Sequence, residues 1–227
     1  PHVPHEIMPY NERWGLGVRV IVNEDYKRLP KGAYGWSGAY GTHFWIDPEN
    51  KIIGSGTILD TARLRARISE YYSVNQKNVH AYILGEHGDT AFVPWSIANI
   101  SNVPIEDYSK LAMTSNYYPE FNRHEIENYV RQSGARIIQR KGATFYAVSI
   151  SVCHICKCIF SGAGTALSVS TMMHGEYGVS DVCLSTLVLV DRNGVRGKIL
   201  NPLTEEETAK MQLSAEKLKS VIAQIEI

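Results

Sequence analysis

The spacing of apolar residues predicts four helices after residue 50. Over residues 59–72 they recur every three or four positions, which is the pattern of an amphipathic helix. Two more helices are predicted at about residues 123–140 and 143–160. A fourth closes the chain, and its start is marked by Thr204 with Glu207 three residues later, the spacing of a capping box.

Between these helices, short runs rich in β-branched residues predict strands. One run covers residues 79–84 and leads into Gly85-Glu86-His87-Gly88-Asp89. Strand patterns return later, at residues 168–172, 182–190 and 195–200. Strands and helices mixed in this way indicate an α+β domain, and its boundary is expected near residues 50–54.

The first fifty residues differ from the rest of the chain in their content of aromatic residues and glycines. Three of the four tryptophans lie between residues 14 and 48, and residues 34–45 alternate aromatic side chains with glycines. Residues 18–22 also read as a strand, so we expect a small segment of antiparallel β-structure at residues 1–50. A sheet of only a few strands is marginally stable without a partner layer. We therefore expect this segment to pack on an apolar face of the following domain or to stay loosely ordered.

Length and composition exclude several classes of protein. The 227 residues suffice for one large or two small domains with a hydrophobic core. The 23 basic residues equal the 23 acidic ones, which argues against a nucleic-acid or membrane-surface partner. The apolar stretch at residues 143–160 is broken by His154 and Lys157 and is too short to span a bilayer. Because the start lacks Met and a signal pattern, we expect a fragment or a processed product.

The four cysteines are clustered rather than spread along the chain. Cys153, Cys156 and Cys158 lie within six residues, and Cys183 follows. This clustering argues against a disulfide framework and predicts a reducing, cytoplasmic setting. A metal site of Cys153, Cys156 and His154 is the alternative, but a closed zinc site needs four ligands and no second pair exists. We favour a mostly buried helix in which cysteine acts as a small hydrophobic residue, and we expect no metal.

Gly-x-Gly, part of the dinucleotide-binding fingerprint, occurs at residues 15–17, 54–56 and 162–164. The fingerprint needs a third glycine, and those positions hold Val20, Leu59 and Leu167. The sequence therefore contains no complete Rossmann half that we can find.

Two segments carry side chains suited to acid–base chemistry and anion binding. On a helix, Asp60 and Arg63 are three residues apart and share a face. A carboxylate paired with His87 would fix the imidazole tautomer and raise its pKa, and a neighbouring Arg could bind a carboxylate with two hydrogen bonds. The alternative is a surface ion pair between Asp60 and Arg63 with His87 in an ordinary turn. Spacing alone does not decide between the two.

Five segments resemble the L-lactate dehydrogenase family. They are Ile53–Arg65 (IGSGTILDTARLR), Asn78–Asp89 (NVHAYILGEHGD), Arg140–Thr144 (RKGAT), Ser170–Gly178 (STMMHGEYG) and Leu203–Glu207 (LTEEE). They follow the family's order and spacing over about residues 51–227, which is the C-terminal, substrate-binding half of the family's chain. The resemblance implies a lactate/malate dehydrogenase C-terminal-like α+β fold with antiparallel strands and long helices.

The resemblance also implies roles in the interconversion of pyruvate and lactate. His87 would be the general acid/base, Asp60 would orient it, and Arg63 would bind the carboxylate of a small 2-oxo or 2-hydroxy acid. Thr144 would line the pocket beside the substrate and favour lactate over malate. The implied setting is glycolysis or fermentation.

The same resemblance implies NAD as cofactor and an allosteric ligand. Ser55 would lie near the nicotinamide amide, and Val148 would pack on the nicotinamide ring. Arg65 and His80 match the pair that binds fructose bisphosphate between subunits in bacterial members, so a homo-oligomer, and specifically a homotetramer, is expected. The alternatives are a solvated helix face for Arg65 and a strand edge for His80.

A weaker resemblance covers the first fifty residues. Residues 14–20 and 35–48 look like the C-terminal region of serine β-lactamase-like hydrolases and esterases. Such enzymes need a Ser-x-x-Lys nucleophile upstream of this region. Here that motif occurs at Ser214–Lys217, downstream of it, and we interpret it as a chance match on a solvated helix face.

The leading hypothesis is a bacterial L-lactate dehydrogenase C-terminal domain behind a short hydrolase-derived segment, with little turnover because the NAD-binding half is missing. A non-catalytic, oligomerising or phospho-ligand-binding remnant is the second hypothesis. A hydrolase is the weakest.

Overall fold

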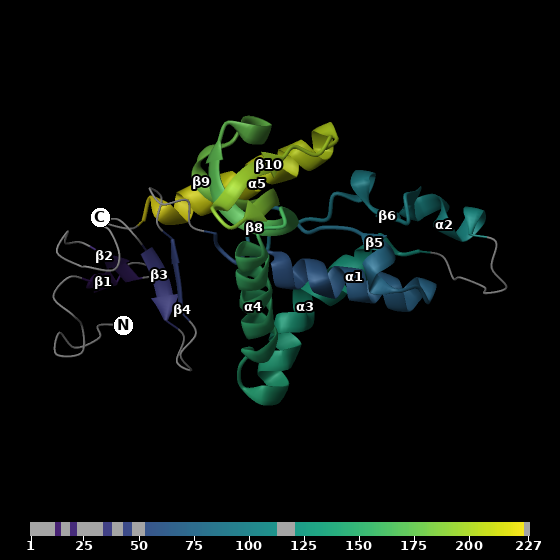
Figure 1. Ribbon diagram of the computed structural model, residues 1–227, viewed down its shortest axis with the longest axis horizontal. Helices are drawn as coiled ribbons and strands as arrows, with labels where there is room; N and C mark the ends of the chain where they lie inside the picture. The colour runs from purple at the N-terminus through teal and green to yellow at the C-terminus, as the bar shows by residue number, and fades with distance from the viewer. Residues whose placement is uncertain are drawn as a thin grey trace.

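The computed structural model describes residues 53–112 and 121–224, together with four short strands before them (Figure 1). These strands are β1 (Glu12–Trp14), β2 (Arg19–Ile21), β3 (Tyr34–Ser37) and β4 (His43–Ile46). They pair antiparallel in the order β1-β2-β3-β4, which confirms antiparallel structure for this part of the chain. The rest of residues 1–50 lies outside the described residues, and so does the predicted packing of this segment on the following domain.

A second antiparallel sheet carries much of the core of the C-terminal part. Its order is β10-β9-β8, and its strands are β8 (Thr165–His174), β9 (Ser180–Asp191) and β10 (Gly194–Ile199). Residues 184–188 of β9 are all buried, as are Val182 and Val190 on either side of them. Because successive side chains of a strand point to opposite faces, β9 is covered on both faces over that stretch. The three later strand predictions are confirmed, and β8 is longer than predicted.

All four predicted helices are present, and their ends fall within a few residues of the predicted ones. They are α1 (Ile58–Tyr72), α3 (Arg123–Lys141), α4 (Tyr146–Ser161) and α5 (Glu205–Ile222). The capping box of α5 is also confirmed. The hydroxyl of Thr204 accepts from the N–H of Glu207 at 3.2 Å, and the Glu207 carboxylate accepts from the N–H of Thr204 at 3.0 Å.

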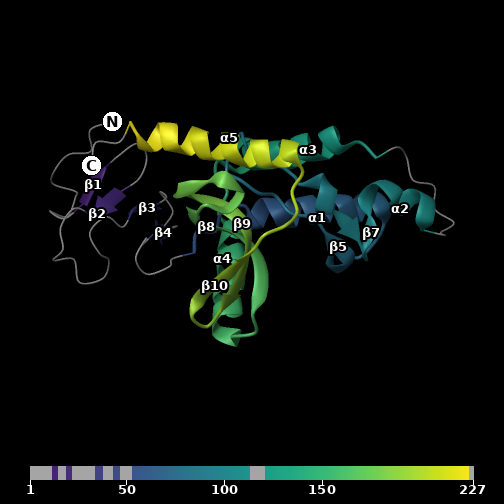
Figure 2. The same cartoon turned by 90° about the horizontal axis from the view of Figure 1, so that it is seen from above.

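Helices α4 and α5 contribute to two different clusters of the core. Ile155 of α4 packs with Val188 of β9, and Met211 of α5 packs with Leu184 of the same strand. Figure 2 shows α5 along one edge of the molecule, with α4 and β10 extending away from it. The sheet therefore fixes the relative positions of α4 and α5.

A third, small sheet lies beside α1, and most of it was not predicted. Its order is β5-β6-β7. The remaining short elements are β5 (Val79–His80), β6 (Asn99–Ile100), β7 (Val103–Pro104), α2 (Ile105–Leu111), η2 (Gln76–Asn78), η3 (Trp95–Ile97) and η4 (Glu176–Gly178). Elements of two to seven residues are too short to show a period in the sequence, so β6, β7 and α2 were missed.

The strand predicted over residues 79–84 is wrong beyond His80. Residues 81–83 belong to no strand, and Leu84 and Gly85 form only isolated bridges, to Phe92 and Ser185. The apolar side chains of this run are buried because the segment crosses the interior between α1 and the sheet, rather than because it pairs as a strand.

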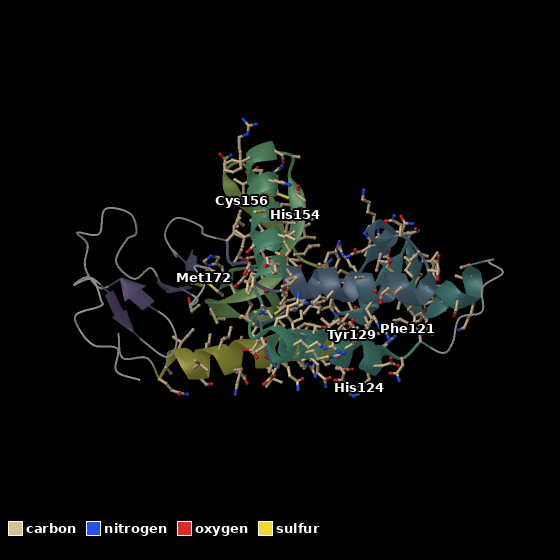
Figure 3. The ribbon with its side chains drawn as sticks, turned by 90° about the horizontal axis from the view of Figure 1, so that it is seen from below. Phe121, His124, Tyr129, His154, Cys156 and Met172 are labelled. Atoms are coloured by element: carbon tan, nitrogen blue, oxygen red, sulfur yellow. The ribbon has the colours of Figure 1, made fainter. Side chains whose placement is uncertain are left out.

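The apolar composition of α4 predicted a mostly buried helix, and that prediction is wrong. Ile155 and Cys158 are buried, but Ile150 is 71% and Phe160 is 83% exposed. Figure 3 shows His154 and Cys156 along α4 where the helix projects from the rest of the molecule. The composition of α4 did not reveal which of its apolar side chains meet the sheet.

Candidate functional site

Two buried threonines fix α1 against the segment that leads to His87. The Thr57 hydroxyl donates to the carbonyl of Ile83 at 2.5 Å. One turn later, the Thr61 hydroxyl accepts from the N–H of Ile83 and from the hydroxyl of Ser168, both at 2.9 Å. Thr57 and Thr61 are 0% and 5% exposed, so these bonds are made inside the protein. Hydrogen bonds in the interior define one register between α1 and this segment.

The chain then turns tightly at the start of the histidine loop, which we define as residues 86–90. Gly85 exchanges two backbone hydrogen bonds with Ser185, at 3.0 and 2.8 Å. Its φ is +93°, and a Cβ there would lie 2.7 Å from the hydroxyl oxygen of Ser214, so glycine is required. The turn brings His87 to the first turn of α1.

Asp60 joins two basic side chains at that end of α1. Its Oδ2 lies 2.7 Å from Nδ1 of His87, and its Oδ1 accepts a hydrogen bond from Nη1 of Arg63 at 2.9 Å. Asp60 and Arg63 are 14% and 17% exposed, whereas the side chain of His87 is 64% exposed. The predicted group is therefore assembled, and a His87 turned away from Asp60 is excluded. Because Nδ1 faces Asp60, Nε2 is the nitrogen left for a ligand.

Relative to their ordinary values, the pKa of His87 is raised and the pKa of Asp60 is lowered. The hydrogen bond to Asp60 is the largest effect on His87, and it raises the pKa of the imidazole although burial and the charge of Arg63 oppose it. Burial is the largest effect on Asp60 and would raise its pKa, but the bonds and charges of His87 and Arg63 outweigh burial and lower it. His87 therefore keeps its proton at a higher pH than a free imidazole, which suits a proton donor near neutrality.

A cavity of about 890 Å³ opens beside this group. Six residues singled out from the sequence line it: Ser55, Asp60, Arg63, His87, Thr144 and Val148. One wall is formed by the start of α1 and the histidine loop, and another by α4 with the turn before it. The fold thus gathers these six residues from three separate segments of the chain.

Helix α3 forms a third wall, which the sequence analysis missed. Its lining residues are Glu127, Val130, Arg131, Gly134, Ala135 and Ile138. Their spacing of three or four is that of one helix face, so the periodicity contained a signal. The sequence does not say which cavity that face meets. Arg131 brings a second guanidinium to the cavity in addition to Arg63.

The residues of the predicted fructose bisphosphate site lie outside that cavity. Nε of Arg65 donates to the carbonyl of Ala81 at 2.9 Å, and the guanidinium lies 4.7 Å from the ring centroid of Tyr82. His80 and Tyr82 line a second cavity of about 450 Å³, together with Asn201. Arg65 and His80 are therefore both close to Tyr82.

Ser214 is not on a solvated helix face, so that prediction is wrong. It is 0% exposed, and its hydroxyl oxygen accepts from the N–H of Glu86 at 2.8 Å. Its partner in the Ser-x-x-Lys motif, Lys217, is exposed. A serine buried in this way cannot meet a substrate as a nucleophile, which favours the chance match.

Neither a metal-binding cluster nor a membrane-spanning helix occurs among the residues that the structure describes. In those ranges no three His, Cys, Asp or Glu side chains are grouped so that they could hold a metal ion. No disulfide joins any of the four cysteines, and Sγ of Cys158 lies 3.8 Å from Nε2 of His154. No helix in the described part of the chain is long and apolar enough to cross a membrane.

Comparisons with known proteins agree with one another. The chain is 42% identical over 227 residues to an L-lactate dehydrogenase of Acetivibrio thermocellus, which covers 100% of the chain and 67% of that enzyme. It is 42% identical over 180 residues to an L-lactate dehydrogenase of Thermoanaerobacter sp. (strain X514), which covers 79% of the chain and 57% of the relative. The comparisons give no support to a hydrolase-like segment.

A solved structure shows the same fold. The crystal structure of a lactate dehydrogenase from a Medee basin deep-sea metagenome library matches with a TM-score of 0.71 and 37% identity, over 76% of this chain and 54% of that one. The chain thus spans between 54% and 67% of the length of these relatives. Residues 57–226 match the family model described as lactate/malate dehydrogenase, alpha/beta C-terminal domain. The chain belongs to the lactate/malate dehydrogenase family, and this region is its C-terminal domain.

Proposed function

We propose that the chain is the substrate-binding half of an NAD-dependent L-lactate dehydrogenase. The observation that carries the proposal is the hydrogen-bonded row of His87, Asp60 and Arg63 on the wall of one cavity. The names of the two relatives at 42% identity support the same reaction. Three of the four cysteines lie within six residues, and this clustering supports a reducing, cytoplasmic location.

Each of the three side chains has a distinct task in this reaction. The guanidinium of Arg63 uses Nη1 for Asp60 and has further N–H groups with which to bind the carboxylate of pyruvate. Nε2 of His87 donates a proton to the carbonyl oxygen as hydride adds to the carbonyl carbon, which gives lactate. Asp60 stabilises the imidazolium before the transfer and holds the remaining proton on Nδ1 afterwards. In the reverse direction, neutral His87 removes the hydroxyl proton of lactate.

The side chains of the α4 wall and of residue 55 fit a nicotinamide. Val148 offers an apolar surface for the flat ring, and Ser55 offers a hydroxyl to its amide, on the cavity that His87 also lines. When bound, the nicotinamide supplies or accepts the hydride. Thr144 lines the same cavity, and in our proposal it favours pyruvate over the larger, doubly charged oxaloacetate.

The reaction can be tested in a hybrid that adds the part of the Acetivibrio thermocellus enzyme outside the 67% that the chain covers. The hybrid is expected to oxidise NADH with pyruvate and much more slowly with oxaloacetate. Arg63→Lys should lower kcat/KM by on the order of 10²-fold, because an ammonium group cannot make two parallel bonds to a carboxylate. Arg67→Lys, one turn further along α1, is the matched control. A hybrid that folds and binds NADH but reduces neither acid would contradict the proposal.

The 227 residues by themselves are expected to turn over little or no lactate. Hydride transfer requires the cofactor to be held against the substrate, and the three Gly-x-Gly sites lack the dinucleotide fingerprint. Measurable NADH formation from lactate by the pure chain at ordinary NAD concentrations would contradict this expectation.

A second proposal concerns Arg65 and His80, which in our view bind fructose bisphosphate in a homo-oligomer. Both lie close to Tyr82, and Oδ1 of Asn201 is buried in the second cavity without a hydrogen-bond partner among the described residues. A guanidinium and an imidazole suit phosphate oxygens. Calorimetry with fructose bisphosphate should give a heat of binding that Arg65→Ala abolishes and that Lys77→Ala preserves. No heat with the unmodified chain, or a monomer in sedimentation at all concentrations, would contradict it.

A further inference from the structure

Ser214, from the helix that closes the chain, contacts both ends of the histidine loop. Its hydroxyl oxygen accepts from the N–H of Glu86 at 2.8 Å, immediately before His87. The same oxygen lies 2.8 Å from Oγ1 of Thr90 and 3.4 Å from the carbonyl oxygen of Thr90, at the end of the loop. A single buried hydroxyl therefore joins the two ends of a five-residue loop.

The direction of these hydrogen bonds follows from counting protons. The hydroxyl of Thr90 donates to Oε1 of Glu86 at 2.5 Å, and the N–H of Thr90 donates to the same oxygen at 3.0 Å. A hydroxyl has one proton to donate, so the proton between Thr90 and Ser214 comes from Ser214, which directs it to Oγ1 of Thr90 at 2.8 Å rather than to the more distant carbonyl oxygen. Ser214, Thr90 and Glu86 thus form a closed ring of hydrogen bonds around the base of the loop.

The position of Ser214 is set by packing that does not involve the loop. Met211 and Ala215, on the same side of α5, are 0% and 4% exposed in the core against β9. The carboxylate of Glu207, in the first turn of α5, also accepts from the N–H and the hydroxyl of Ser96, at 3.1 and 2.5 Å. Helix α5 is therefore held in place by contacts outside the histidine loop.

His87 has little other support. Its side chain is 64% exposed, so packing around the ring does not hold it. Among the residues that the structure describes, the groups that act on it are Asp60, Arg63 and Glu86, and of these three only Asp60 is hydrogen-bonded to the ring. The place of the ring consequently depends on the backbone of the histidine loop, which Ser214 and Thr90 hold.

We propose that Ser214 is a positioning residue for His87, which holds the histidine loop in the conformation that brings Nδ1 of His87 onto Asp60. The contribution of Ser214 to catalysis rests on the proposed function, whereas the test of how Ser214 places His87 does not. Loss of the hydroxyl frees both ends of the loop at once and leaves the N–H of Glu86 without its acceptor.

The test is an NMR titration of the His87 imidazole in the full chain without substrate. In Ser214→Ala the pKa of His87 should fall towards that of an exposed imidazole, because the contact with Asp60 is loosened. Two matched variants of α5 should leave it unchanged: Ser220→Ala removes an exposed hydroxyl, and Ala215→Gly weakens the buried face of the helix. In the hybrid, Ser214→Ala should lower kcat by on the order of tenfold with KM nearly unchanged, because Arg63 still binds the carboxylate.

Thr90 provides the test if Ser214→Ala does not fold. Thr90→Val removes the hydroxyl and should lower the pKa of His87, whereas Thr90→Ser keeps it and should preserve the pKa. An unchanged pKa in folded Ser214→Ala or in Thr90→Val would overturn the proposal. A hybrid without dehydrogenase activity would contradict the proposed function alone, since the titration requires no turnover.

Discussion

The two principal walls of the 890 Å³ cavity are built in different ways. The α1 wall is fixed by hydrogen bonds of Thr57 and Thr61, which are 0% and 5% exposed, and it carries Asp60 and Arg63. The α4 wall packs on the sheet on one side, and on the other leaves Ile150 71% exposed. The groups proposed to bind substrate and transfer the proton therefore lie on the wall whose geometry is fixed within this domain.

This difference shows how one cavity can combine precise and adaptable parts. A proton donor and a carboxylate ligand must be held in one geometry, and buried hydrogen bonds do this on the α1 wall. An apolar surface for a flat ring requires only shape, and α4 supplies it from a helix held mainly through Ile155 and Cys158. Substitutions on the two walls should consequently have different effects.

The largest effect is expected for Asp60→Asn on the α1 wall. The amide keeps the shape of the side chain but neither stabilises the imidazolium nor raises the pKa of His87. In the hybrid, kcat for pyruvate should fall by about 10²–10⁴-fold, the usual size of a general acid–base contribution. Asp181→Asn, at an exposed carboxylate of β9 that does not line the cavity, is the control and should change kcat little. If kcat of Asp60→Asn equalled that of the control, Asp60 would have no role in proton transfer, and the difference proposed between the two walls would be contradicted.

Two substitutions on α4 separate its buried side from its exposed side. Ile155→Ala should lower the free energy of unfolding by about 2–5 kcal/mol, because Ile155 is 7% exposed and packs on the sheet. Ile150→Ala, on the exposed side, should change it by no more than about 0.5 kcal/mol. Urea denaturation of both variants measures the difference. Equal losses would mean that α4 is packed on both sides.

A buried hydroxyl of the α1 wall can be compared with an exposed one of α4. Thr61→Val leaves the N–H of Ile83 and the hydroxyl of Ser168 without their acceptor, which should cost about 1–3 kcal/mol of unfolding free energy. Ser149→Ala removes an exposed hydroxyl bonded to the carbonyl of Phe145, and should cost no more than about 0.5 kcal/mol. The same urea experiment checks both, and a Thr61→Val variant as stable as the unmodified chain would contradict the account.

The smallest effect is the pH dependence of stability that the Asp60–His87 pair contributes. His87 has a raised pKa in the folded chain, so its contribution is full below the ordinary imidazole pKa and is lost as pH rises through the raised value. Asp60 has a lowered pKa, so its contribution is present above the ordinary carboxyl pKa and is lost as pH falls through the lowered value. The stability difference from His87→Gln should peak between the two pKa values. Solvent screening keeps it small, and a pH-independent difference would contradict the pairing.

Much of the fold could be predicted because its long elements repeat a period many times. Helices α1 and α3 and strand β9 follow their predicted ranges closely, and α5 begins at its predicted capping box. Residues 81–84 were wrongly predicted as part of a strand, since a segment buried between α1 and the sheet carries the same apolar pattern as a strand. Helix α4 was wrongly predicted to be mostly buried, because apolar composition does not reveal whether a second layer covers the helix.

The residues of the candidate site could be predicted from the sequence, but the residues that hold them in place could not. The spacing of Asp60 and Arg63 indicated an ion pair and left a pairing with His87 open, and the resemblance to a known family favoured that pairing. The sequence did not show that Ser214, more than a hundred residues away, fixes the loop of His87, since a hydroxyl in an amphipathic helix carries no sign of its partner. The cavity face of α3 was missed for the same reason: periodicity defines a face but not its neighbour.

The most direct test of the account is the NMR titration of His87 in the unmodified chain and in Asp60→Asn. In the unmodified chain we expect the pKa of His87 to lie above that of an exposed imidazole, because Oδ2 of Asp60 lies 2.7 Å from Nδ1, and we expect Asp60→Asn to remove that elevation. The same ordinary pKa in both proteins would contradict it, because the wall that carries Asp60 would then not hold His87 at all.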